Sequence, residues 1–319
     1  MNRSDTTKGY AQASVAPAVN SEKRASYFGR HWRGELSLGI SYWVDGVLLG
    51  WALVLVGAIV SSAALLGLLS LMLTAAFSLA LWPLTVFLSV WQLVGIWRSA
   101  SNHVSRGGAA AWAMIAQFIV VISVLACPVL VYTSYIPQSA ELLSILGGDT
   151  RLPSYQIRVV SAGTEIVFRG GLRAGCATEL KRVLSGAKQV KMLEIESPGG
   201  RVGEAEQMAR LVREYGLITY SSKYCLSAAT LMLMSGKDRV VAPGAKIGLH
   251  AGTTPGITAF ERLLVDNMMR MTMRSAGVTD EFIKRVVATP PNQMWYPTFE
   301  EMREAGVVDR QSHMLSDIQ

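Results

Sequence analysis

Two long stretches of this 319-residue chain contain no Asp, Glu, Lys or Arg; they cover residues 47–97 and 107–140. A helix needs about 20 consecutive apolar residues to cross the hydrocarbon core of a bilayer. The first stretch is long enough for two such helices, at about 47–66 and 71–97, and the second for one more, at about 111–135. Half of all residues are hydrophobic and only 17% are charged. We therefore expect three transmembrane helices rather than the buried core helices of a soluble protein.

Basic residues indicate which ends of these helices face the cytoplasm. Four Lys and Arg residues between positions 23 and 33 precede the first span, and Arg98 and Arg106 lie in the loop before the third. After the third span the charged residues Glu141 and Asp149 come before the first basic one, Arg151. The positive-inside rule therefore predicts a cytoplasmic N-terminus and an extracytoplasmic segment after about residue 138. The net charge of +7 is partly this topology signal, and no basic patch with interleaved aromatic residues points to a nucleic-acid partner.

The chain divides into four parts on this basis. Residues 1–33 are polar and predict a flexible cytoplasmic tail, 34–137 form the membrane region, 138–154 are a linker, and 155–319 form a globular domain. Within that domain, strand-like segments such as VKMLEIES, LITYSS and KIGLH alternate with helical ones such as ATELKRVLSG and GEAEQMARLVREYG. Three more helices are expected at about 259–275, 281–288 and 299–305. Alternation of this kind predicts an α/β domain with a largely parallel sheet.

The segment from Cys225 to His250 carries the residues that suggest chemistry. Ser227 stands between small residues at the start of an apolar helical stretch, and His250 ends a short strand. A serine hydroxyl needs an adjacent base to become nucleophilic, and the domain offers only His250 and His313 as histidines. The alternatives are a small packing residue at 227 and a structural histidine at 250. No CxxC motif or Cys/His cluster has metal-ligand spacing, so we expect neither a metal nor a cofactor.

Three motifs in order, ESPGG, CLSAAT and APGAKIGLH, resemble the Clp protease family of the Clp/crotonase superfamily and its signal peptide peptidase A-like relatives. The resemblance covers residues 155–310 and is strongest to a bacterial group of membrane-anchored, predicted periplasmic Clp-like proteins. It implies a Clp/crotonase-like α/β domain, a serine peptidase activity and a homo-oligomer. It also implies a multi-pass protein of the bacterial inner membrane with a periplasmic C-terminal domain.

Carried over onto this sequence, the resemblance assigns a role to each matching residue. Ser227 would be the nucleophile and His250 the general base, with the backbone N–H groups of Gly200 and Ala228 forming the oxyanion hole. Consecutive glycines let main-chain amides face a ligand without obstruction, and such donors typically account for about 10²–10³ in rate each. The same resemblance implies these substrate-binding positions: Gly199, Arg201, Ala251 and Gly252.

The third catalytic residue is where the match is weakest. The family places an acid about fifteen residues before the aspartate of an ending that is AGVVD here, with Asp309. That count falls within PPNQMWYP, which contains no acid, and Asn292 is the residue nearest in kind. The other carboxylates considered are Asp280, Asp266 and Glu281, all from neighbouring helices. Separately, Cys176 and Cys225 both lie in the exported half, where an oxidising compartment would allow a disulfide between them.

Three functions remain open at this point. The first is a membrane-tethered serine peptidase that cuts peptides or membrane-protein segments. The second is a non-catalytic Clp-like module that binds peptides or scaffolds an assembly because it lacks a competent acid. The third, a crotonase-type activity on a thioester, is less favoured because exported domains rarely meet coenzyme A.

Overall fold

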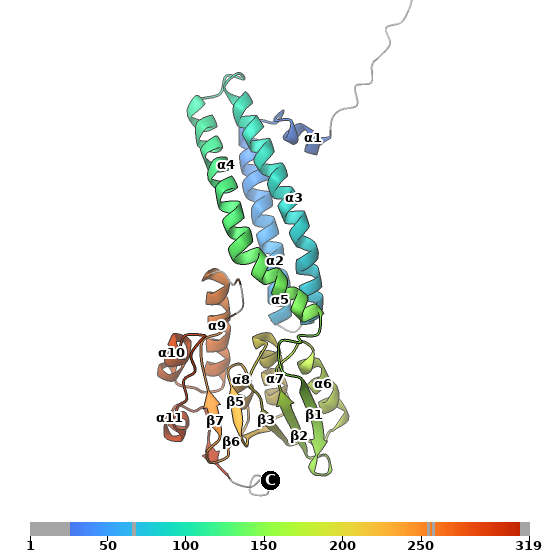
Figure 1. Cartoon of the computed structure of the whole chain (residues 1–319), viewed down its shortest axis with the longest axis vertical. Helices are drawn as coiled ribbons and strands as arrows, with labels where there is room; N and C mark the ends of the chain where they lie inside the picture. Colours follow the sequence, from blue (N-terminus) through green and yellow to red (C-terminus); the bar gives the residue numbers. More distant parts are fainter. Residues whose placement is uncertain (1–25, 66–67, 254–255, 257–258, 313–319) are drawn as a thin grey trace, which may run out of the picture.

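The computed structural model describes residues 26–65, 68–253, 256 and 259–312 of the chain. Figure 1 shows two parts, a group of long helices that lie side by side and an α/β domain at one end of them. Three helices are long and apolar enough to cross a membrane: Ile40–Ala63, Leu71–His103 and Ala110–Leu146. They match the three predicted transmembrane helices in number and order.

Each of these helices extends beyond the range expected from the sequence. The first consists of a π-helical segment, η1 (Ile40–Leu48), followed by α2 (Leu49–Leu65). The second is α3 (Leu71–His103), which begins at Ser70, whose Oγ accepts a hydrogen bond from the Leu73 N–H. The third combines α4 (Ala110–Leu130), a π-helical segment η2 (Val131–Tyr135) and α5 (Ile136–Leu146). Hydrophobic runs mark where a helix is apolar, but the helix itself continues into polar sequence.

The third helix is long enough to project well beyond a bilayer. Its 37 residues span about 55 Å at about 1.5 Å per residue, against a hydrocarbon core of about 30 Å. Pro137 follows the π-helical segment η2 inside this continuous helix, and its ring removes one backbone N–H donor from the helix there. The predicted linker 138–154 is therefore wrong in its first half, because residues up to Leu146 are helical.

The end of the predicted flexible tail is also structured. Residues Tyr27–Trp32 form helix α1, and His31 is completely buried against α3, with its ring centroid 4.2 Å from that of Trp91. The Tyr27 hydroxyl donates to Asp45 Oδ1 at 2.8 Å, and His31 Nδ1 lies 2.9 Å from Asp45 Oδ2. The expectation of a flexible tail up to residue 33 is wrong here, because aromatic packing and these polar contacts fix α1. Since η1 begins at Ile40, Asp45 also lies within the first apolar helix.

The α/β domain is built on one six-stranded sheet. Its strand order is β1-β2-β3-β4-β6-β8, with β1 antiparallel to β2 and the other neighbours parallel. A separate parallel pair, β5 and β7, continues beyond the main sheet. The strands are β1 (Tyr155–Val160), β2 (Glu165–Gly170), β3 (Met192–Glu196), β4 (Ile218–Ser221), β5 (Tyr224–Leu226), β6 (Arg239–Val241), β7 (Lys246–Gly248) and β8 (Arg310–Gln311). This confirms the predicted α/β architecture with a largely parallel sheet.

Helices connect the strands and cover one face of the sheet. Ile166 and Phe168 of β2 and Leu193 and Ile195 of β3 are fully buried in the same core as the inner sides of α6, α7 and α8. The helices of the domain are α6 (Cys176–Gly186), α7 (Val202–Glu214), α8 (Ala229–Met234), α9 (Ala259–Ser275), α10 (Asp280–Ala288) and α11 (Phe299–Glu304), with a short 3₁₀ turn η3 (Ser161–Gly163) between β1 and β2. The helices α9, α10 and α11 begin and end within one residue of the predicted ranges.

Candidate active site

Ser227 stands on a sharp turn between β5 and α8. Its φ is 54°, in the left-handed region that a non-glycine residue rarely adopts. The turn is held by two hydrogen bonds, from the Ser227 N–H to the Gly248 carbonyl at 2.8 Å and from Thr230 Oγ1 to the Ser227 carbonyl at 2.7 Å. Strained residues persist where the surroundings determine them, and they cluster at functional sites. A strained strand-to-helix turn also exposes the hydroxyl of a nucleophilic serine.

The β5–β7 pair brings His250 to the same place. In the parallel register Leu226 lies opposite Gly248, so Ser227 and His250 both leave the same end of the ladder. Neighbouring strands lie about 4.8 Å apart, and both side chains are half-buried. The structure therefore brings together the two residues that the sequence singled out, although no hydrogen bond between their side chains occurs among the described residues. Catalytic hydrogen bonds in ligand-free structures are often long and tighten only with substrate.

The His250 ring is oriented by its own backbone environment. Its Nδ1 lies 2.7 Å from the Ala251 carbonyl oxygen. A carbonyl can only accept, so Nδ1 carries a proton; in the neutral ring, Nε2 then holds the lone pair that a general base requires. The alternative histidine, His313, lies outside the described residues.

Gly199 and Gly200 run directly beside Ser227. A Cβ at Gly199 would lie 2.8 Å from Ser227 Cβ and 3.3 Å from the Ala228 nitrogen, so only glycine fits this approach. Gly200 has a φ of 145°, and a Cβ there would lie 2.6 Å from the Leu172 carbonyl oxygen. Within the described part of the chain, neither the Gly200 N–H nor the Ala228 N–H donates to an acceptor. Two unused donors beside a serine hydroxyl are what an oxyanion hole requires.

The Arg201 side chain is engaged within the protein. It is only 14% exposed and forms ion pairs with Glu141 of α5 and with Asp149. Desolvation works against both charges of the Arg201–Asp149 pair, but the hydrogen bonds between them prevail: the pKa of Asp149 lies below its ordinary value and that of Arg201 above. Two carboxylates therefore occupy the guanidinium, and a substrate-binding role for Arg201 stays a prediction.

Ala251 and Gly252 are also engaged within the protein. The Ala251 N–H donates to the Thr289 carbonyl at 3.0 Å, and Ala251 is buried. A Cβ at Gly252 would lie 2.7 Å from Val265 Cγ1 and 2.9 Å from Met269 Sδ, both on α9. These two residues therefore set the close approach of α9 to the strand that carries His250.

The segment expected to supply the third catalytic residue is joined to the residue before His250. Leu249 and Trp295 form an antiparallel bridge with two hydrogen bonds of 2.9 Å. Met294 precedes this bridge and lies beside β7, where a Cβ at Gly248 would lie 2.8 Å from Met294 Cγ. Asn292 is exposed, in a turn closed by the Gln293 N–H and the Pro290 carbonyl. A count of fifteen residues back from Asp309 falls on Met294 itself (309 − 15 = 294), and Asn292 is preferred to it only because its amide is nearer in kind to an acid than a thioether is.

Trp295 holds this segment in place. Its ring lies 4.6 Å from that of Phe282, and the Arg285 guanidinium lies 4.1 Å above it. Trp295 thus anchors the segment that carries Met294 against α10.

The carboxylates considered as alternatives differ in their surroundings. Asp280 forms a hydrogen-bonded ion pair with Arg274 at 2.7 Å and is 63% exposed, and Glu281 is exposed. Asp266 is half-buried, and its Oδ1 has no hydrogen-bond partner among the described residues. Burial raises the pKa of Asp266, and Arg270 and Arg262 oppose this shift. Asp266 follows Val265, which contacts Gly252, so it is the one of the three whose free carboxylate oxygen lies on the helix packed near His250.

Both cysteines of the domain are free, so the disulfide considered between them is not formed. The Cys176 thiol lies 3.6 Å from Glu204 Oε2 and 3.5 Å from Met208 Sδ. Cys225 is the buried central residue of β5 and pairs with Ser197 on one side and with Ile247 of β7 on the other. Burial raises the pKa of both thiols, which keeps them protonated and unreactive.

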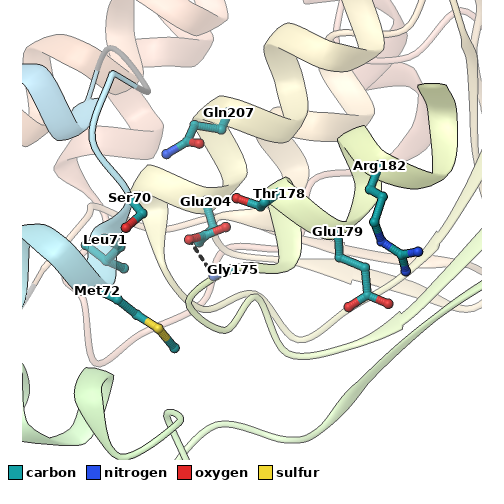
Figure 2. Close-up of a pocket in the computed structure, with 9 residues that line it drawn as sticks. All are labelled: Ser70, Leu71, Met72, Gly175, Thr178, Glu179, Arg182, Glu204 and Gln207. Carbon is teal, nitrogen blue, oxygen red and sulfur yellow. Dashed lines mark hydrogen bonds between the residues drawn. The ribbon is translucent and has the colours of Figure 1, made fainter.

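A cavity of about 500 Å³ lies away from this site, between the turn that joins α2 to α3 and the helices α6 and α7. Figure 2 shows the Glu204 carboxylate directed at Gly175, whose N–H donates to it at 2.8 Å. A second bond, 2.9 Å from the Ala177 N–H, leaves Glu204 committed to the start of α6. Neither Ser227 nor His250 lines this cavity.

Comparison with known proteins gives fold-level neighbours only. No protein-family model matches the chain, and a search of curated proteins finds no match. Among solved structures, ClpP1 from Listeria monocytogenes is similar at 14% identity and a TM-score of 0.44, covering 50% of this chain and 96% of that one. The ClpP protease catalytic domain from Plasmodium falciparum is similar at 21% identity and a TM-score of 0.38, covering 48% and 83%. Similarities of this size assign no activity to the chain.

Proposed function

We propose that this chain is a membrane-tethered serine peptidase that hydrolyses peptide bonds with Ser227 as nucleophile and His250 as general base. The observation that carries the proposal is the convergence at one end of the β5–β7 ladder. There a serine on a strained turn lies beside the unused Gly200 and Ala228 N–H groups and shares its ladder end with a histidine whose Nδ1 is engaged by the Ala251 carbonyl, which leaves Nε2 for the base.

The chemistry follows from this arrangement. His250 Nε2 takes the Ser227 proton as Oγ attacks the carbonyl carbon of the scissile peptide, and the Gly200 and Ala228 N–H groups bind the oxyanion that forms. The imidazolium then returns the proton to the leaving amine. Water releases the acyl group by the same steps, with His250 again as base. The Ala251 carbonyl holds the ring in place, but as a neutral group it stabilises the imidazolium less than a carboxylate would.

The proposed location is the inner membrane of a bacterium, with the three apolar helices in the bilayer and the α/β domain outside the cytoplasm. The distribution of basic residues supports this orientation. The proposed substrates are peptides or segments of membrane proteins, because the third apolar helix ends against the domain.

A fluorophosphonate probe, which reacts with activated serines, tests the proposal on the detergent-solubilised full chain. We expect wild type to be labelled, Ser227→Ala to be unlabelled and His250→Ala to lose about 10²–10⁴ in labelling rate, the usual contribution of a general base. Ser185→Ala, which removes an exposed hydroxyl on α6, is the matched control and should label like wild type. Light scattering on the same samples shows whether the protein is intact and tests the expectation of a homo-oligomer.

A second function, a non-catalytic peptide-binding module, is favoured by one observation: among the described residues no carboxylate binds the His250 ring, whose Nδ1 lies against the Ala251 carbonyl. A wild-type protein that is folded and of uniform mass, yet unlabelled, would support this second function over the peptidase.

A further inference from the structure

The segment after β3 that carries Gly199 and Gly200 is held by side chains from α5 and from the connection between α5 and the domain. Arg201, the residue after Gly200, directs its guanidinium to two carboxylates, Glu141 on α5 and Asp149 in the connection to the domain. All three are largely buried: Asp149 is 1% exposed, and the Glu141 and Arg201 side chains are 11% and 14% exposed. Buried ion pairs keep their geometry far better than exposed ones, because solvent does not screen them.

Hydrogen bonds with Leu172, together with Asp149, also fix the backbone around Gly200. The Leu172 N–H donates to the Gly199 carbonyl at 2.9 Å, and the Arg201 N–H donates to the Leu172 carbonyl at 2.8 Å. Asp149 Oδ2 accepts from the Ala174 N–H at 2.8 Å while it also binds Arg201 Nε at 3.1 Å. Asp149 therefore ties together the two chain segments that flank the Gly200 N–H.

Helix α5 also contacts the segment that follows His250. Gln138 Nε2 donates to the Gly256 carbonyl at 3.0 Å. A Cβ at Gly256 would lie 2.8 Å from the Ser134 carbonyl oxygen and 3.1 Å from Pro137 Cβ. Glu141 lies one turn after Gln138, so the same helix contacts Gly256, in the segment that follows His250, and Arg201, next to Gly200.

We propose that Arg201 is a positioning residue: clamped by Glu141 and Asp149, it holds the Gly200 N–H in place for the oxyanion and couples that N–H to the third apolar helix. This inference rests on the proposed peptidase function, which it deepens. A shift of α5 along or around its axis moves Glu141, and through Arg201 it moves the oxyanion donor. The membrane region thereby acts on the reaction as well as anchoring the domain.

Inactivation by the fluorophosphonate tests the catalytic side of this coupling. Glu141→Gln keeps a hydrogen-bonding side chain of the same shape but removes one charge, and we expect the maximal inactivation rate to fall about 10-fold, a part of the loss typical of one oxyanion donor, with the concentration dependence unchanged. Arg201→Met should lose more, and Arg201→Lys should restore part of the rate. The matched control is Arg151→Gln, which removes the other partner of Glu141, a 55% exposed arginine that does not reach Gly200. Equal rates for Glu141→Gln, Arg151→Gln and wild type would overturn the proposal.

Amide hydrogen exchange provides a readout that needs no catalysis. In a Ser227→Ala background we expect Glu141→Gln to speed exchange in peptides covering 197–202 while peptides from β3 and β4 stay as protected as before. Unchanged exchange at 197–202 refutes the clamp whether or not the chain is a peptidase. Faster exchange there in a protein whose wild type is not labelled leaves the clamp standing and rejects the peptidase. Loss of protection throughout the domain would mean that Glu141 acts in folding alone, and would also overturn the proposal.

Discussion

At the scale of single residues, the candidate site differs from a complete Ser-His-acid triad at one position. The ring of His250 is oriented by the Ala251 carbonyl, and a count of fifteen residues back from Asp309 falls on Met294, not on an acid. A thioether neither accepts a strong hydrogen bond nor carries charge. Loss of the carboxylate in a serine triad lowers turnover by about 10⁴ in the best-studied case, so a slow enzyme is the expected consequence.

Restoring a carboxylate at this position should therefore accelerate the reaction. We expect Met294→Asp to raise the rate of fluorophosphonate labelling at least about 10-fold, within the roughly 10⁴ that a triad carboxylate can contribute. Met294→Asn, of the same shape but without charge, should give little gain. If Asn292→Asp accelerates labelling and Met294→Asp does not, the third catalytic position lies at Asn292 in the exposed turn and not at Met294.

At the scale of elements, the contact between α5, the 149–151 segment and the start of α7 joins the two parts of the chain. Within this contact Asp149 is buried and accepts hydrogen bonds from Arg201 and from the Ala174 N–H. Because breaking a buried ion pair leaves an uncompensated charge, it commonly costs about 3–5 kcal/mol. The free energy of unfolding of the domain should thus depend on this carboxylate being ionised.

The pH dependence of stability checks this element. The folded-state pKa of Asp149 lies below its ordinary value of 3.8, so its contribution is fully present above about pH 4 and is lost as the pH falls through the folded-state pKa. We expect Asp149→Asn to lower the unfolding free energy at neutral pH, and the gap to wild type to narrow as the pH falls below about 4. Thermal melts of wild type and Asp149→Asn in detergent at a series of pH values measure this gap. A gap that is constant down to pH 2 would show that Asp149 stabilises the fold through shape alone.

At the scale of the whole molecule, the three apolar helices and the α/β domain lie end to end (Figure 1), so the site's distance from the membrane is set by the third helix. That helix is about 55 Å long, about 25 Å more than the hydrocarbon core. Under the proposed placement of α4 in a bilayer, α5 would emerge at the membrane surface next to the domain that carries the candidate site. Segments of membrane proteins that extend from the bilayer would then meet the site first.

Labelling with a membrane-impermeant maleimide checks this arrangement. With Cys127→Ser as background, Ser185→Cys on exposed α6 should react in intact cells, and Ser105→Cys, in the loop between α3 and α4, only after permeabilisation. Cys176 and Cys225 are buried and should stay unreactive in the folded protein. The reverse pattern of reactivity would place the domain in the cytoplasm.

The sequence by itself determined the features that depend on local pattern. Uncharged runs predicted three apolar helices, because a bilayer-length helix needs only the residues of its own segment. Alternating periodicities predicted the α/β domain. The resemblance in the spacing of Gly199–Gly200, Ser227 and His250 to the Clp protease family singled out the residues that lie at the end of the β5–β7 ladder.

Only the tertiary structure decided the features that depend on partners distant in the chain. Arg201 became a clamp because Glu141 lies 60 residues before it and Asp149 52 residues before it. The segment that carries Met294 lies beside β7 because Leu249 and Trp295, 46 residues apart in the chain, form a bridge (295 − 249 = 46). The helical part of the linker and the packing of α1 against α3 have the same cause. A polar segment becomes ordered when contacts with a buried partner compensate its loss of conformational entropy. The sequence of the segment does not show which residues that partner will be.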